Sequence, residues 1–261
     1  MTPAVATPVD VKLMNMTARV LFVAFVVVGA VATARWVIRL PAFDIKGIAV
    51  SGDVSHNNEL NLRANVASRL SGTFFSIDLA KVRAAFEAVP WVRHAIVHRE
   101  FPNRLQVVLQ EHQAVAYWGR DGELRLINNF GEVFEANVGD VEQEGLPILN
   151  GPDGQGAEVL AMYSALAPLF EQMELPLDGL ELSGGRSWRA QLDTGATIEL
   201  GRGDTTEVTA RVRRFLKTLT QVTSRYARRN SALEAADLRH ENGYAVRLRG
   251  VSTTVPAVPN K

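Results

Sequence analysis

The longest apolar segment lies near the amino terminus, where VLFVAFVVVGAVATA separates Arg19 from Arg35. As a helix this run spans about 22 Å at ~1.5 Å per residue. The flanking arginines can extend their charged ends toward lipid headgroups, and Trp36 favours the interfacial layer, so the span reaches the thickness of a bilayer. The pattern predicts a transmembrane helix at residues 18–40, after a cytoplasmic tail of residues 1–17 to which no structure is assigned.

A cleavable signal peptide is the alternative for this segment. Lys12 and Arg19 precede the apolar run, and Ala32 to Ala34 form the small-residue pattern of a cleavage site. The anchor is favoured because the run is at the upper limit for a signal core and continues into apolar residues after Arg35. Basic residues flank both ends of the run, so their count does not set its orientation.

Residues 43–113 change between strand and helix periods in the order β-α-α-β-β. The stretch FDIKGIAVS is rich in strand formers and ends at a glycine turn. Two segments with apolar residues every three or four positions follow, and two alternating runs then meet at a Pro-Asn turn. This order predicts a three-stranded sheet with both helices on one side. The residues that carry the pattern are Leu62, Val66 and Leu70, then Leu79, Val82, Phe86 and Val89, then Ala95, Val97 and Phe101, and finally Leu105, Val107 and Leu109.

Local signals set the ends of these elements. Asp78 can cap the second helix, and Pro90 prevents its continuation. The hairpin turn is predicted to pair Glu100 with Leu105, which fixes the register of the two strands.

Residues 114–250 read as short strands interrupted by two helices, which predicts a mixed antiparallel-sheet domain and an α+β chain overall. Asp204 and Glu207 form a capping box before the second helix, and Pro168 is an irregularity that bends or shortens the first. The predicted strands are 180–182, 187–192, 196–200 and 243–249, and the predicted helices carry Val159, Tyr163, Leu166 and Phe170 in one case and Val208, Val212, Phe215, Leu219, Val222 and Tyr226 in the other.

The other side of that second helix is basic. Such a face is interpreted as solvated surface, with an acidic partner or anionic lipid as the alternative. Its residues are Arg211, Arg213, Arg214, Lys217, Arg225, Arg228 and Arg229.

The last alternating run, GYAVRLR, predicts a half-buried strand at residues 243–249. Only a flexible tail of residues 251–261 follows, so this strand is expected to lie at a sheet edge. An edge can accept a strand from another protein, or charged side chains such as Arg247 and Arg249 can blunt it. Composition alone favours the blunted edge.

Composition and charge exclude chemistry rather than suggest it. Lys plus Arg equals Asp plus Glu at 28 each, so nothing points to nucleic acid, and the absence of cysteine excludes disulfides and thiolate sites. His94 and His98 share a strand face but lie roughly 13 Å apart, too far for one metal ion. No motif for a serine nucleophile, a zinc protease or a phosphate loop occurs. We expect no catalytic residue, metal site or cofactor, and a carboxylate dyad assembled by the fold is the enzymatic alternative.

Motifs in sequence order resemble the bacterial FtsQ family of cell division proteins, called DivIB in Gram-positive bacteria. The β-α-α-β-β order is similar to the POTRA domain of that family, and Phe101 stands where tryptophan is expected. The other matching residues are Pro90-Trp91-Val92, Pro102, Glu111, Trp118, Leu146-Pro147, Gly151-Pro152, Ser187-Trp188, the run Leu200 to Asp204, and Asp237-Leu238-Arg239.

The resemblance implies a bitopic inner-membrane scaffold at the division septum, with periplasmic domains and no catalysis. It implies that the POTRA domain at residues 43–113 recruits the protein through upstream components. It also implies that the β domain at residues 114–250 docks FtsB, itself paired with FtsL, by strand addition. The alternatives are a membrane-anchored cell-wall enzyme and a POTRA-type protein-translocation accessory. The implied partner-binding residues are His240, Asn242, Gly243, Tyr244, Ala245, Val246, Arg247, Leu248 and Arg249.

Overall fold

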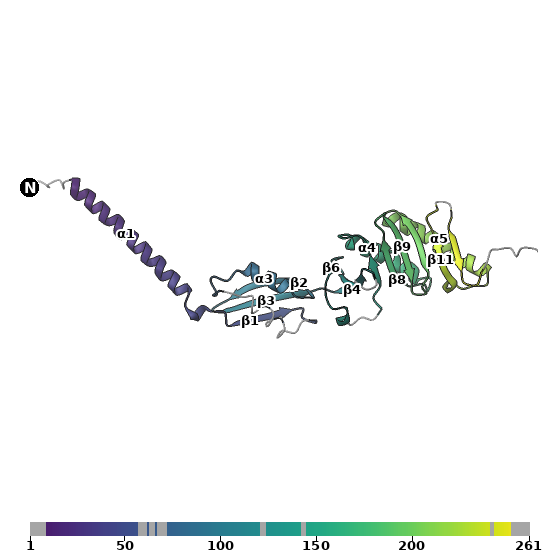
Figure 1. Ribbon diagram of the computed structural model, residues 1–261, viewed down its shortest axis with the longest axis horizontal. Coiled ribbons are helices and arrows are strands. Elements are labelled where there is room, and N and C mark those ends of the chain that lie inside the picture. The colour runs from purple at the N-terminus through teal and green to yellow at the C-terminus, as the bar shows by residue number, and fades with distance from the viewer. Residues whose placement is uncertain are drawn as a thin grey trace, which may run out of the picture. The chain divides into compact units, whose positions relative to one another are not determined.

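The chain divides into two compact units, Met1–Glu111 and His112–Lys261. Figure 1 traces the helices and strands of each unit. The computed structural model describes residues 9–56, 62, 66, 72–120, 124–141, 145–240 and 243–251.

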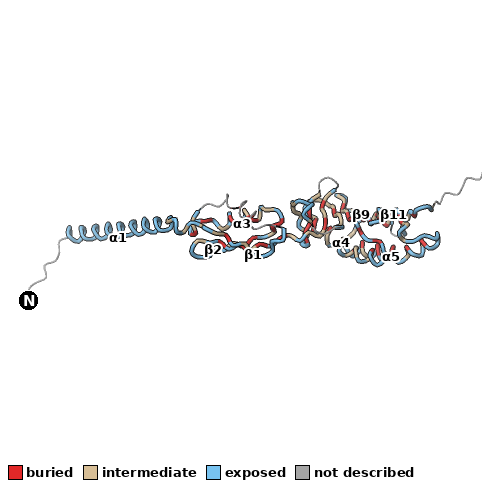
Figure 2. The backbone as a smooth tube through the Cα atoms, turned by 90° about the horizontal axis from the view of Figure 1, so that it is seen from below, coloured by how far each residue is buried: buried red, intermediate tan, exposed pale blue. Residues whose placement is uncertain are grey.

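The apolar amino-terminal segment forms one continuous helix, α1 (Val9–Ile38), of 30 residues. Its length, and a mean hydropathy of 2.2 over its most apolar 18 residues, are sufficient for it to cross a membrane, and its residues are exposed along the whole helix (Figure 2). The prediction that residues 9–17 lack structure was wrong. No glycine or proline lies between Pro8 and Gly29, so nothing in the sequence interrupts a helix there.

In the first unit a three-stranded sheet, in the order β1-β3-β2, carries one hydrophobic core. Strand β1 pairs with β3 in parallel, and β2 pairs with β3 antiparallel. Phe86, Leu105 and Val107 are fully buried in this core. The elements of the unit after α1 are η1 (Pro41–Phe43), β1 (Gly47–Gly52), α3 (Leu79–Glu87), β2 (Val92–Glu100) and β3 (Arg104–Glu111).

The second helix predicted for this unit is confirmed. The carboxylate of Asp78 accepts hydrogen bonds from two backbone N–H groups of α3, at 3.0 and 3.3 Å, and the helix ends before Pro90. Of the first predicted helix, Leu62 and Val66 are helical and buried in the same core. Leu70 and the other positions of that helix lie outside the described residues.

The register of the β2–β3 hairpin differs from the prediction by one residue. Glu100 lies opposite Arg104 rather than Leu105, because the loop between the strands contains only residues 101–103. Phe101 therefore belongs to the loop and is 73% exposed. The alternation had predicted that Phe101 shares the buried face of Ala95, and this prediction was wrong.

A nine-stranded sheet of described strands forms the second unit, in the order β12-β11-β10-β9-β8-β7-β4-β5-β6. The pairs β10–β11, β4–β7 and β7–β8 are parallel, and the others are antiparallel, so the predicted mixed sheet is confirmed. Helices α4 and α5 pack on each other and on strands β8 and β10. The elements are β4 (Ala114–Trp118), β5 (Arg125–Asn128), β6 (Val133–Phe134), η2 (Val138–Asp140), β7 (Ile148–Asn150), α4 (Gly156–Glu171), β8 (Leu177–Leu182), β9 (Ser187–Leu192), β10 (Thr197–Arg202), α5 (Thr205–Arg225), η3 (Asn230–Ala232), β11 (Leu233–Asp237) and β12 (Ala245–Leu248).

The turn from β10 into α5 is fixed by the predicted capping box. The carboxylate of Asp204 accepts from the amide of Glu207 at 2.9 Å, and the Glu207 carboxylate accepts from the amide of Asp204 at 3.3 Å. Beside this turn Trp188, only 1% exposed, donates from Nε1 to the carbonyl of Gly203 at 3.1 Å. Pro168 lies inside α4, which continues to Glu171, so it does not shorten that helix.

Candidate functional site

Strand β12 lies at one end of the nine-stranded sheet. Among the described strands it pairs only with β11, antiparallel, with Val246 opposite Ala236 and Ala245 opposite Asp237. The other side of β12 therefore presents a strand edge, as expected from the position of this run in the sequence. An edge of this kind is a template for pairing with another chain.

The backbone groups on that edge follow from the alternation of an antiparallel ladder. The amide of Arg249 donates to the carbonyl of Ala232 at 2.8 Å, so Arg249 faces β11. Arg247 and Ala245 share this direction, whereas Val246 and Leu248 point their amide and carbonyl groups outward. The Leu248 carbonyl already accepts from the Val251 amide at 3.2 Å. Within the described part of the chain, the outer row therefore consists of the N–H and C=O of Val246 and the N–H of Leu248.

The side chains of β12 alternate between the core and solvent, as predicted. Leu248 is buried, and Tyr244 and Val246 pack against the hydrophobic core of the second unit. Ala245, Arg247 and Arg249 are exposed on the opposite side of the strand. The expected blunting by arginine is therefore limited, because these side chains project from the face of the sheet rather than along the pairing direction. Arg249 also forms an ion pair with Glu234, with 3.7 Å between Nε and Oε1.

Tyr244 connects the edge to helix α5. Its hydroxyl lies 2.6 Å from the Thr218 hydroxyl, and its ring meets the Phe215 ring edge to face with centroids 5.0 Å apart. This arrangement holds the residue just before β12 against the helix.

The segment before β12 contains an ion pair between Asp237 and Arg239 at the end of β11. The carboxylate of Asp237 accepts from Nε and Nη2 of Arg239 at 2.9 and 2.6 Å. These side-chain hydrogen bonds, more than any other effect, lower the pKa of Asp237 from its ordinary 3.8 to about 2. His240 and Gly243 are exposed in the connection that follows. Asn242, named with them as a partner-binding residue, lies outside the described residues.

A pocket of about 370 Å³ lies between this connection and α5. Three of the predicted partner-binding residues, His240, Gly243 and Tyr244, line it together with residues of the helix and Leu238. Sequence reasoning named Arg211 and Arg214 only as part of a possible acidic-partner face and did not place Phe215 or Thr218 in a site, although the three- and four-residue spacing puts all of them on one helical face. Those residues are Arg211, Arg214, Phe215 and Thr218.

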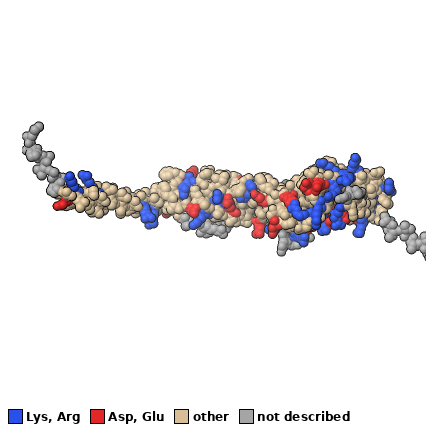
Figure 3. Space-filling model, turned by 90° about the horizontal axis from the view of Figure 1, so that it is seen from above, with Lys and Arg blue, Asp and Glu red and all other residues tan. Residues whose placement is uncertain are grey.

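The basic face of α5 is mostly solvated, as interpreted, and Figure 3 shows lysine and arginine side chains gathered on the surface of the second unit. Arg228 and Arg229, which were predicted on this face, lie beyond the end of α5 at Arg225. Two of the predicted residues donate to backbone carbonyls. Arg211 donates to the backbone carbonyls of Leu200 and Arg202 and so links α5 to the last residues of β10. Arg228 donates to the carbonyl of Gly250, at 3.2 Å.

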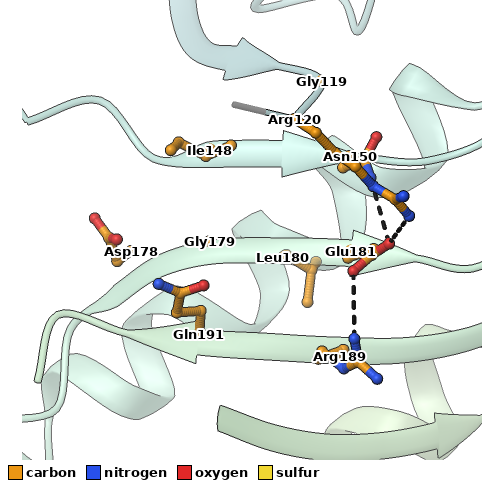
Figure 4. Close-up of a pocket in the computed structure, with 10 residues that line it drawn as sticks. All are labelled: Gly119, Arg120, Ile148, Asn150, Asp178, Gly179, Leu180, Glu181, Arg189 and Gln191. Carbon is orange, nitrogen blue, oxygen red and sulfur yellow. Dashed lines mark hydrogen bonds and ion pairs between the residues drawn. The ribbon is translucent and has the colours of Figure 1, made fainter. Parts of the chain in front are cut away.

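A second pocket, of about 400 Å³, lies over strands β7, β8 and β9 (Figure 4). The carboxylate of Glu181 in this pocket accepts from Arg120 at 2.7 Å and from Asn150 at 3.4 Å, and it lies 3.8 Å from Arg189. Arg189 in turn contacts Glu199 at 2.7 Å. The charged side chains of this pocket are thus compensated by one another and by Glu199, which leaves little net charge for a ligand.

The histidines do not form a metal site in the described part of the chain, where no group of three or more His, Asp or Glu side chains converges. His56 is exposed overall, but its ring has specific partners. Its ring stacks on Trp91 with centroids 3.9 Å apart, and its Nδ1 lies 3.1 Å from the buried carboxylate of Glu111. No local sequence signal predicts this contact, because the partners Trp91 and Glu111 lie 35 and 55 positions away.

The fold defines an α+β protein in which an amino-terminal helix, long and apolar enough to cross a membrane, precedes a POTRA-like unit and a mixed-sheet domain. Family models agree with this class: "POTRA domain, FtsQ-type" matches residues 43–112, and "Cell division protein FtsQ/DivIB, C-terminal" matches residues 116–239.

Relatives match over nearly the whole chain. The cell division protein FtsQ of Burkholderia pseudomallei strain K96243 is 37% identical over 243 residues, which cover 93% of this chain and 94% of the relative. FtsQ of Thiomonas arsenitoxydans is 36% identical, with 94% and 89% covered, and FtsQ of Bordetella pertussis is 33% identical, with 92% of each covered. The chain belongs to the FtsQ/DivIB family of cell division proteins, as its sequence motifs had indicated.

Proposed function

We propose that this protein is a single-pass scaffold of the bacterial division machinery that binds partner proteins and catalyses no reaction. In this proposal α1 anchors the chain in the inner membrane at the septum, with the amino terminus cytoplasmic and both units periplasmic. The POTRA unit at residues 43–113 recruits the protein through upstream components, and the domain at residues 114–250 docks FtsB, which is paired with FtsL.

The observation that carries the proposal is the open outer edge of β12. A partner strand laid along this edge would satisfy the amide and carbonyl of Val246 and the amide of Leu248 with main-chain hydrogen bonds. Such bonds give affinity without requiring a particular partner sequence, so side-chain contacts next to the edge have to provide the selectivity.

The surroundings of the edge supply those contacts. The pocket between α5 and the β11–β12 connection is apolar at Phe215 and Leu238 and basic at Arg214. Arg247 is exposed on β12 itself, and no acidic group of the described residues forms an ion pair with it. An acidic partner segment with one apolar anchor fits this combination, because opposite charge favours encounter and the anchor fills a desolvated pocket.

Residue-resolved hydrogen exchange tests the proposal on the complete chain in lipid nanodiscs, with and without the periplasmic segments of FtsB and FtsL. We expect the amides of Val246 and Leu248 to exchange about tenfold or more slowly when the partner is bound, since a new hydrogen bond must open first. The amide of Arg247 serves as the control within the same strand, because it already faces β11 and should change much less. Protection that leaves β12 untouched would contradict strand addition.

A further inference from the structure

Four phenylalanine rings gather in the first unit around the segment that follows α1. Phe43, Phe74, Phe75 and Phe101 form an aromatic cluster with edge-to-face contacts. The ring centroids are 4.9 Å apart for Phe43 and Phe75, 5.2 Å for Phe74 and Phe75, and 6.0 Å for Phe74 and Phe101. Phe75 is 47% exposed and Phe101 is 73% exposed. Outside α1, the only other exposed phenylalanine in the described part of the chain is Phe130, in the second unit. Exposed apolar rings are thus concentrated at this one place in the first unit.

Two hydrogen bonds to backbone carbonyls hold this aromatic cluster next to the end of α1. The hydroxyl of Thr73 donates to the carbonyl of Ile38, the last residue of the helix, at 3.2 Å. The amide of Phe74 donates to the carbonyl of Phe43 at 2.8 Å. Only residues 39–42 separate Phe43 from the helix, which limits the chain between them to about 18 Å even when fully extended. If α1 spans a bilayer, the cluster therefore lies at the membrane surface.

The charges around the cluster are mainly positive. Arg39, Lys46 and Arg104 are exposed, and none of them forms an ion pair with another described residue. Lys46 lies beside the exposed loop of Phe101, since its amide donates to the carbonyl of Asn103 at 2.9 Å. The acidic residues beside these segments are Asp44 and Glu100, and Glu100 lies opposite Arg104 in the β2–β3 pairing. This excess of basic groups suits an anionic lipid surface, where each cation near the headgroups contributes about 1 kcal/mol.

We propose that the aromatic cluster and its basic neighbours form a membrane-contacting surface that rests in the headgroup layer of an anionic bilayer. Aromatic rings favour this layer because part of the ring is removed from water while polar neighbours stay hydrated. The contact would hold the base of the POTRA unit on the membrane and restrict the directions in which it can tilt. The inference rests on the proposed transmembrane role of α1, but it does not depend on partner docking at β12.

Lipid-dependent fluorescence quenching tests this surface in the complete chain. The protein contains no cysteine, so Phe101→Cys provides a single site for an apolar bimane dye that replaces the ring. Val54→Cys is the control, because it is also exposed but lies beyond the opposite end of β1. Both variants are placed in nanodiscs of phosphatidylethanolamine and phosphatidylglycerol that contain doxyl-labelled lipid.

We expect about threefold or greater quenching at position 101 relative to position 54, because an interfacial group lies within about 10 Å of the acyl boundary. Adding Lys46→Glu and Arg104→Glu should reduce the quenching at position 101, while circular dichroism shows that the fold persists. Quenching at position 101 that does not exceed that at position 54, or that ignores the charge reversals, would overturn the proposal. Binding of FtsB and FtsL by the same samples is measured separately, so either proposal can fail without the other.

Discussion

Replacing Val246 with proline removes one main-chain donor from the outer edge of β12 without removing a hydrogen bond to β11. Proline lacks the amide proton and is tolerated in strands only where that proton would face away from the sheet. The neighbouring change Ala245→Pro is the matched control, because Ala245 faces Asp237 of β11 and its amide belongs to the internal ladder.

The magnitude follows from the number of hydrogen bonds that each change removes. For Val246→Pro, a docking strand loses one main-chain bond and keeps a carbonyl without a partner, which costs about 1–3 kcal/mol of binding free energy. This corresponds to roughly 5- to 150-fold weaker affinity. The free energy of unfolding should stay within about 1 kcal/mol of the original, since the proline ring replaces a side chain of similar size. Ala245→Pro should instead lower the free energy of unfolding by about 1–3 kcal/mol.

Two measurements on the same samples decide the outcome. Calorimetric titration of the nanodisc-embedded chain with FtsB and FtsL segments gives the affinity, and denaturant unfolding followed by tryptophan fluorescence gives the stability. Val246→Pro is expected to lose affinity and keep stability, whereas Ala245→Pro should lose stability first. Wild-type affinity of a folded Val246→Pro variant would refute docking by strand addition.

Two further predictions concern the second unit. Gly131→Ala should lower the free energy of unfolding by about 2–5 kcal/mol, because a Cβ at this position (φ +79°) would lie 2.3 Å from the Cα of Ala157. The control is Gly154→Ala, at φ +78° in open space, which should lower it by only about 1–2 kcal/mol. Equal losses for the two variants in denaturant titrations would contradict the steric explanation. The lowered pKa of Asp237 means that its stabilising contribution is present above pH 3.8 and is lost as the pH falls through about 2. In an NMR titration, Arg239→Gln should therefore return the pKa of Asp237 toward 3.8, and an unchanged midpoint would show that Arg239 is not the cause.

Strong local signals predicted individual elements well. The strand at 187–192 was predicted to the residue, because its alternation is regular and turns bound it on both sides. The caps at Asp78 and Asp204 were also correct, since an N-cap depends on residues only two or three positions away.

Features that depend on distant partners were missed or misjudged. Strand β11 was not predicted, because LEAAD has only five residues and gains its strand conformation from β10 and β12 on either side. The predicted register of β2 on β3 was wrong by one residue. The register depends on the length of the loop between the strands, and the alternation of apolar residues did not decide between Arg104 and Leu105 as the partner of Glu100. In the candidate site the edge itself was expected from the order of the runs, but the pocket on α5 required the fold that brings Tyr244 to Phe215.

The outermost position of β12 has a consequence for damaged copies of the protein. Proteolysis after Arg239 would remove this strand but leave α1, the POTRA unit and eight strands of the large sheet in one piece. Under the proposed function, such a trimmed copy would still reach the division site and compete there for a place without recruiting FtsB. A cell that holds both forms should therefore divide less well as the trimmed share of the protein rises.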